Sequence, residues 1–203
     1  MQSFDAGWAG RDRPDLIATA SKSSRERHRG PELLSTRPTD QSVCLVEPSV
    51  ALVIQGAKRM SLAEGSYHYD PQHFLITSLN LPAGMQVLEA TEERPYLGLA
   101  LKLDLRMVGE LTLQAPETLL RDAAPSRGMV LGETTPALLE AFQRLVALLD
   151  EPLSIPMLAP LIQREICWRD LISEQGERLR QIVSVGSQGH RVARTLEWLR
   201  GHY

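Results

Sequence analysis

Few residues of this 203-residue chain are of the types that bind metals or act as nucleophiles, and their spacing favours neither chemistry. His68 and His73 lie five positions apart in a segment that reads as extended chain, so their side chains point to opposite faces. Glu89 is the acidic candidate on the following strand, and a site of two histidines and one carboxylate is therefore incomplete. Cys44 and Cys167 lie in apolar stretches that keep a thiol inert. We predict no metal site, no catalytic residue and no cofactor.

Sequence motifs that mark the common enzyme classes are also missing from the chain. It contains no G-x-S-x-G nucleophile elbow, no G-x-G-x-x-G dinucleotide fingerprint and no phosphate-binding P-loop. The two cysteines form no C-x-x-C pattern, which argues against a disulfide framework and fits a reducing compartment. No enzyme activity is expected.

Several polar side chains lie within or beside apolar stretches and are candidates for holding a small ligand. They are Gln55, Tyr69, Thr77 and Ser78, with Arg94 in a turn as a further candidate. A small barrel can hold one ligand in its mouth, where an apolar lining is combined with a few polar anchors. Each side chain could orient a ligand there. Each could instead hydrogen-bond a neighbouring strand or face water, and Arg94 could be a solvated turn charge.

The elements that would hold these side chains are short strands, separated by turn signals about every 8–12 residues. The predicted strands are Val43–Val46, Val50–Gln55, Ala57–Leu62, Tyr67–Tyr69, Phe74–Leu79, Met85–Ala90 and Tyr96–Leu103. Such a run without alternating helices is typical of an antiparallel sandwich or barrel rather than a parallel α/β fold. In the last strand Leu97, Leu99, Leu101 and Leu103 share one face, which we expect to pack inward.

After residue 104 the apolar period changes to that of helices. Leu105–Leu113 predicts a short helix, and Met129–Leu131 predicts one more strand. Thr135 and Pro136 then open a second helix, because threonine is a good N-cap and proline is tolerated at the first helical position. A third helix follows at Ser154–Glu174, with its prolines confined to the first turns.

The helix Ser154–Glu174 carries a long apolar seam and a tryptophan, a residue type enriched in interfaces. The predicted dimerisation residues are Leu158, Leu161, Ile162, Glu165, Trp168 and Ile172. Glu165 and Arg169 are spaced to form an i,i+4 ion pair. The whole seam could also pack on the rest of the same chain. We expect one side to pack on the strands and the other on a partner copy.

The ends of the chain and its overall charge limit the possible partners. Residues 1–40 are polar and aperiodic, and we expect a flexible arm whose basic segment either contacts DNA or a partner or is solvated. A net charge of −3 gives no general attraction to nucleic acid or anionic membranes. The sequence shows no signal peptide and no apolar run of about 20 residues. A cytoplasmic protein with no membrane contact is expected.

An ordered series of short motifs resembles the N-terminal domain of AraC-type bacterial transcription regulators. The series covers about residues 45–203 and consists of Leu52–Arg59, Tyr69–Pro71, Ser78–Pro82, Glu92–Leu97, Leu158–Arg169, Gly176–Ile182 and Arg194–Arg200. Two positions depart from the family pattern. Gln72 stands where a glycine usually follows the proline, and Asp170 stands where an apolar residue is common.

The resemblance implies a cupin-like antiparallel β-barrel that binds a small-molecule effector, followed by a helical unit that forms a homodimer. It divides the chain into a flexible arm (1–40), the barrel (41–132), the helical dimerisation unit (133–185), and a linker with the first helix of a missing helix-turn-helix DNA-binding domain (186–203). The implied function is effector sensing and dimerisation in a regulator that controls transcription. A stand-alone cupin-fold small-molecule-binding protein and a metal-dependent cupin enzyme are the alternatives.

Overall fold

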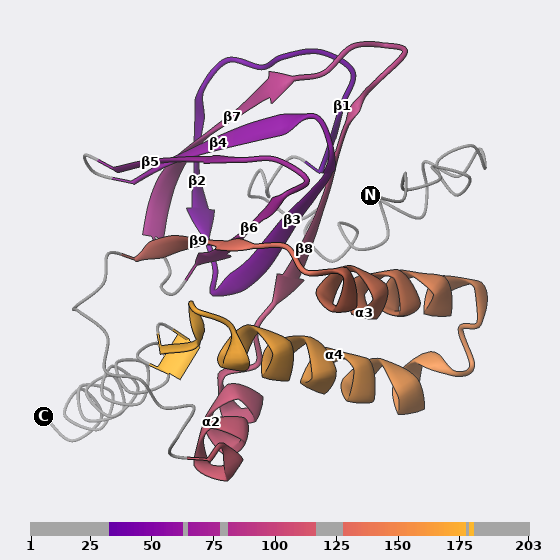
Figure 1. The fold of residues 1–203 in the computed structure, drawn as a ribbon. Coiled ribbons are helices and arrows are strands. Elements are labelled where there is room, and N and C mark those ends of the chain that lie inside the picture. The colour runs from indigo at the N-terminus through magenta and orange to yellow at the C-terminus, as the bar shows by residue number, and fades with distance from the viewer. Residues whose placement is uncertain (1–32, 63–64, 78–80, 117–127, 178, 181–203) are drawn as a thin grey trace, which may run out of the picture.

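The fold is given by a computed structural model, drawn in Figure 1, which describes residues 33–62, 65–77, 81–116, 128–177 and 179–180. The predicted linker and last helix lie outside these residues, as does most of the predicted arm. Within the described part, two β-sheets lie together and the helices gather on one side of them (Figure 1).

The strands form two antiparallel sheets, which confirms the predicted fold class of mainly antiparallel β-structure with helices. The five-stranded sheet has the order β1 (Leu34–Ser35), β8 (Tyr96–Lys102), β3 (Ser49–Gln55), β6 (His73–Thr77) and β9 (Met129–Glu133). The four-stranded sheet has the order β2 (Ser42–Val46), β7 (Leu81–Glu89), β4 (Ala57–Leu62) and β5 (Gly65–Tyr69). Strand β1 falls inside the range predicted as an arm, because Leu34 and Ser35 pair with the start of β8.

Three α-helices and a 3₁₀ turn complete the described residues: α2 (Leu105–Gln114), α3 (Pro136–Ala147), η2 (Leu148–Asp150) and α4 (Ile155–Ile172). Two of the predicted helix starts are confirmed by their caps. The Thr135 hydroxyl accepts a hydrogen bond from the backbone N–H of Leu138, and Pro136 follows at the first helical position. Asp104 caps α2 in the same way, through the backbone N–H groups of Arg106 and Met107.

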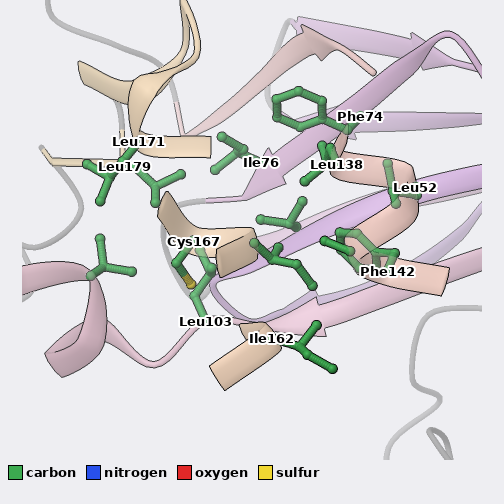
Figure 2. Close-up of a cluster of buried hydrophobic side chains, with 14 of the residues drawn as sticks. Leu52, Phe74, Ile76, Leu103, Leu138, Phe142, Ile162, Cys167, Leu171 and Leu179 are labelled. Atoms are coloured by element: carbon green, nitrogen blue, oxygen red, sulfur yellow. The ribbon is translucent and has the colours of Figure 1, made fainter. Parts of the chain in front are cut away.

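The interior has two apolar clusters, one on each side of the five-stranded sheet. The helical core lies between that sheet and the helices and contains Val50, Leu52, Phe74, Ile76, Leu103, Val108, Leu111, Leu138, Ala141, Phe142, Leu148, Ile162, Ile166, Cys167, Leu171 and Leu179. Figure 2 shows residues of this core that come from the sheet and from the helices. The inter-sheet core joins the two sheets and contains Cys44, Val46, Val53, Met60, Tyr69, Leu75, Ala83, Met85, Val87, Ala90, Tyr96 and Met129.

The leucine face of β8 packs inward, as expected, and the layer that it contacts is that of the helices rather than the one between the sheets. Leu99 and Leu101 pack against the helical core, together with the following Leu103. Tyr96, on the opposite face of the strand, belongs to the inter-sheet core. Both faces of this sheet are covered, so an apolar face alone does not show which of the two layers it contacts.

A tight connection between β3 and β4 directs the chain from one sheet to the other. Gly56 joins the two strands with a φ of +83°, a conformation that side chains with a Cβ rarely adopt. A Cβ on Gly56 would lie 2.3 Å from the backbone oxygen of Glu89. The pairing of β3 with β8 also shifts its register between Val53 and Gln55, next to this connection. Glycine is therefore required here by both backbone conformation and space.

None of the described helices is long and apolar enough to cross a membrane.

Candidate functional site

A buried lysine lies between the two sheets. Lys58 on β4 is 2% exposed, and in the sheet it stands opposite Tyr69 on β5, so the two side chains share one face. That face is the inner one, because Met60, two residues further along β4, belongs to the inter-sheet core. The Lys58 Nζ lies 5.5 Å from the ring centroid of Tyr96, which comes from β8 of the other sheet. The lysine therefore extends from the four-stranded sheet to the five-stranded one.

Two buried tyrosines lie near this lysine. Tyr69 and Tyr96 are both buried, and their side chains share a hydrogen bond between the two sheets. Burial raises the pKa of the Tyr69 hydroxyl far above its usual value, and the hydrogen bond with Tyr96 offsets only part of this shift. Gly98 leaves space for the Tyr96 hydroxyl, since a Cβ there would lie 2.5 Å from that oxygen. The Tyr69 hydroxyl therefore stays protonated near neutral pH.

A threonine and a thiol lie in the same inter-sheet layer. Thr77 is buried on β6, on the same face as Leu75 of the inter-sheet core, opposite Met129 on β9. The Cys44 thiol donates to the Met85 sulfur at 3.4 Å. Burial raises the pKa of this thiol, and the nearby Lys58 charge acts in the opposite direction. We name Lys58, Tyr69, Thr77 and Tyr96 the inter-sheet polar cluster.

The residues predicted as ligand anchors are only partly brought together. Tyr69 and Thr77 lie in the inter-sheet polar cluster. Gln55 lies at the end of β3, where its Nε2 donates to the backbone oxygen of Pro95 at 2.7 Å and ties β3 to the turn before β8. Arg94 lies exposed in that turn, and its backbone N–H donates to the Thr91 hydroxyl. Ser78 lies outside the described residues.

Sequence reasoning missed Lys58 and Tyr96, although the sequence holds a signal for the lysine. Lys58 and Arg59 are adjacent cations in a strand, and neighbouring strand residues point to opposite faces. One of the two must therefore face the interior. Arg59 takes the outer face, where its Nη1 donates to Gln86 Oε1 at 3.5 Å. Tyr96 was not singled out because the leucines that alternate with it dominate the pattern of β8.

The histidines lie apart from this cluster. The Nδ1 of His73 lies 2.8 Å from Asp70 Oδ1 in the turn before β6, and His68 lies exposed on β5. Among the described residues, no group of three or more histidine, cysteine or acidic side chains is arranged to hold a metal ion. The Asp70 carboxylate also accepts a hydrogen bond from the backbone N–H of Gln72. This bond closes the turn, so the turn forms with Gln72 in place of the usual glycine. Both cysteines are free and buried.

The predicted dimerisation residues on α4 divide between a buried and an exposed side. Ile162 packs in the helical core, and Trp168 packs against it. Leu158, Leu161 and Ile172 are exposed, Leu161 by 62%. Met157, which was not singled out from the sequence, is exposed by 74% and lies one turn before Leu161.

Glu165 lies between these two sides of α4 and holds α3 to α4. Its Oε2 is 2.5 Å from Arg144 Nη2, and its Oε1 is 2.6 Å from Arg169 Nη2. The two guanidinium groups lower the pKa of this carboxyl. The second contact is the predicted i,i+4 pair, which is confirmed.

Asp170 is a buried carboxyl in the helical layer. It is 0% exposed, and among the described residues neither carboxyl oxygen has a hydrogen-bond partner. Burial raises its pKa well above the usual range. Helix α4 continues through this position to Ile172, so the departure from the apolar pattern does not end the helix.

Comparison with solved structures finds similarity to ToxT from Vibrio cholerae. The structure of ToxT from strain SCE256 with a bound unsaturated fatty acid has a TM-score of 0.45 and 10% identity, covering 68% of this chain and 54% of that one. A ToxT structure from strain O395 bound to (E)-4-(8-methylnaphthalen-1-yl)but-3-enoic acid has a TM-score of 0.42 and 9% identity, covering 57% and 48%. The chain thus spans about half the length of these structures.

Sequence comparisons place the chain in one family. No curated protein matches it significantly. A family model described as the AraC-type transcriptional regulator N-terminus matches residues 32–178, which include every described strand and helix. The chain therefore belongs to the family of AraC-type transcriptional regulator N-termini.

Proposed function

We propose that this chain is the effector-sensing and dimerising region of an AraC-type transcription regulator. The observation that carries the proposal is the family match over residues 32–178, which spans both sheets and the helices. The role is one of binding and signalling rather than catalysis. The chemistry of the interior supports this role, because an apolar layer that contains a few polar groups is typical of small-molecule sites.

The effector site is assigned to the inter-sheet polar cluster. Three of its side chains, Lys58, Tyr69 and Tyr96, come from three strands of two different sheets. A ligand that contacts them would contact both sheets at once. Its binding would favour whichever spacing of the sheets suits the ligand, and the shift could not exceed the difference in affinity between the two states.

The five-stranded sheet offers a direct connection from the effector site to the helices. On β3, Val53 belongs to the inter-sheet core and its neighbour Leu52 to the helical core. On β6, Leu75 and Phe74 divide in the same way. A change in spacing between the sheets therefore acts on residues that are one peptide away from contacts with α3 and α4.

The partner surface is assigned to the exposed side of α4, as part of a homodimer. Met157, Leu158 and Leu161 expose apolar side chains over successive turns, and Ile172 extends the same helix toward its end. Ile162 is excluded from this partner surface, because it is buried in the core of its own protomer. DNA recognition is assigned to a helix-turn-helix domain outside the described residues, and a protein that acts on bacterial DNA works in the cytoplasm.

Sedimentation velocity at micromolar concentration tests the dimer. The chain should sediment as a dimer, and Leu161→Ser should shift it to monomer because a desolvated apolar contact is lost. Val43→Ser is the matched control, since Val43 is an apolar residue on β2 that is exposed by 73% and lies outside the helical layer. A monomeric wild type, or a dimer that Leu161→Ser leaves intact, would contradict this surface.

A thermal-shift screen of metabolites tests the sensing role. A ligand present at 100 times its Kd should stabilise the chain by about 2.7 kcal/mol. Stabilisation should be smaller in Tyr69→Phe and Thr77→Val, which change the cluster by one hydroxyl each. A screen in which no metabolite stabilises the protein would count against effector sensing.

A further inference from the structure

We propose that Met157 is an oxidation site of this chain, and that conversion of its thioether to the sulfoxide by hydrogen peroxide separates the dimer. The inference rests on the proposed partner surface of α4 and adds a modification that acts on it. It depends on the exposure of one methionine, on the burial of the other sulfur atoms, and on the apolar side chains that surround the exposed one.

The thioether of Met157 is the exposed one among the described residues. Met157 lies in the first turn of α4 and is 74% exposed. Met60, Met85 and Met129 are each at most 5% exposed, and Met107 packs against the helical core. Oxidation requires contact between the sulfur and the oxidant, so peroxide should reach Met157 before the others.

The two thiols are poor competitors for the same oxidant. Cys44 and Cys167 are free and buried, one in the inter-sheet core and one in the helical core. The thiolate is the form that reacts, and burial raises the pKa of both thiols. Within the described part of the chain, Met157 therefore presents the sulfur that is most accessible to an oxidant in water.

The oxidation needs no reactant besides the thioether and the peroxide. The sulfur lone pair attacks one peroxide oxygen, and an S–O bond forms as the O–O bond breaks. The second oxygen leaves as hydroxide, takes up the proton of the first and becomes water. The sulfur is oxidised by two electrons and the peroxide is reduced by two. An apolar side chain is thereby converted into a polar one.

The surroundings of Met157 are apolar and make this change unfavourable in a dimer. Leu161 lies one turn further along the same side of α4 and is 62% exposed, and Leu153, in the turn before α4, is 95% exposed. The nearby Ser154 hydroxyl already donates to Glu151 Oε2 at 3.3 Å. A sulfoxide oxygen buried on this surface would therefore lack a hydrogen-bond donor from these neighbours.

The penalty is counted twice in a symmetric dimer, because each protomer contributes the same surface. Burial of a polar group without a partner should raise the dimer Kd at least about tenfold. In the dimer the side chain is covered, so the oxidant acts on the free protomer. The modification then holds the chain in the monomeric state until the sulfoxide is reduced.

Peptide mass mapping during treatment with hydrogen peroxide tests the site. Met157 should be fully converted to the sulfoxide while Met60, Met85 and Met129 remain unmodified. Sedimentation velocity on the same samples tests the consequence, and the dimer fraction should fall in step with the conversion of Met157. Methionine sulfoxide reductases for both epimers should restore the thioether and the dimer, which excludes irreversible damage.

Two leucine variants form a matched pair for this experiment. Met157→Leu keeps an apolar side chain of similar volume, so it should form the dimer and retain it in peroxide. Met107→Leu makes the same replacement on α2, outside the partner surface, and should remain as sensitive to peroxide as the wild type. Circular dichroism checks that each variant is folded.

The outcomes separate the oxidation site from the dimer on which it acts. A monomeric untreated chain would overturn the proposed partner surface, and this inference with it. If the untreated chain is a dimer, three results overturn the inference alone: buried methionines that oxidise as early as Met157, a dimer that survives complete conversion of Met157, or a Met157→Leu dimer that peroxide separates as it does the wild type.

Discussion

Replacing Asp170 by asparagine should make the protein less sensitive to rising pH. In the folded chain this carboxyl is fully buried, and among the described residues no group donates to it or accepts from it. Burial therefore holds it in the neutral form and raises its pKa well above the ordinary value of 3.8. In the unfolded chain the carboxyl is in water and titrates near that ordinary value.

The sign and the size of the effect follow from proton linkage. Between the two pKa values the folded state holds a proton that the unfolded state has released. The free energy of unfolding therefore falls as the pH rises, by about 1.4 kcal/mol per pH unit. Below pH 3.8 both states hold the proton, so this contribution to stability is fully present there. Above the folded pKa the loss is complete and the dependence ends.

Urea denaturation of wild type and Asp170→Asn, at pH values increased stepwise from 4.5, measures this directly, with stability taken by linear extrapolation. The difference in unfolding free energy should grow in favour of the variant by about 1.4 kcal/mol per pH unit inside the window. Glu174→Gln is the control, because Glu174 is an exposed carboxyl just beyond α4, and its curve should run parallel to the wild type. Parallel curves for wild type and Asp170→Asn would refute the reasoning and show that the carboxyl ionises freely in the fold.

Three further outcomes test the account of the fold. Gly56→Ala should lower the free energy of unfolding by about 1–3 kcal/mol, because it combines a positive φ with a Cβ 2.3 Å from the Glu89 backbone oxygen; an unchanged urea midpoint would show that the connection relaxes. Thr135→Ala should cost about 1 kcal/mol in the same assay through loss of the α3 cap, whereas Thr135→Ser should cost much less. Cys44 and Cys167 should resist a thiol reagent at pH 8 until the protein unfolds, since burial raises both pKa values, that of Cys167 to about 12. Rapid labelling of the native protein would contradict this burial.

Local signals in the sequence were sufficient for most of the elements. These signals act over a few residues: the prolines and glycines that separate strands, the Thr135-Pro136 helix start and the Glu165–Arg169 spacing. The helix start and the ion pair are present in the structure as expected. The turn at Asp70 also formed without the usual glycine, because the aspartate side chain supplies the hydrogen bond. These features depend on neighbours in the chain and can be derived from it.

The same local reasoning could not predict which layer of the fold each face of a strand contacts. Leu99 and Tyr96 lie on opposite faces of β8, and alternation cannot tell which face meets the helices and which meets the second sheet. The inward position of Lys58 depends on the same choice. Asp170 was marked as unusual, but its complete burial depends on the packing of α4 against other elements. The candidate site is thus a tertiary feature, of which the sequence supplied Tyr69 and Thr77 only as polar residues in apolar strands.

The central claim is that the interior between the sheets is a small-molecule sensing site of an AraC-type regulator. The most direct measurement is the thermal stabilisation of the chain by its best-binding metabolite, compared with that of Tyr69→Phe and Thr77→Val. We expect saturable stabilisation of about 2.7 kcal/mol at 100 times Kd in the wild type, reduced in both variants. Stabilisation of equal size in all three proteins would place the ligand elsewhere and contradict the account.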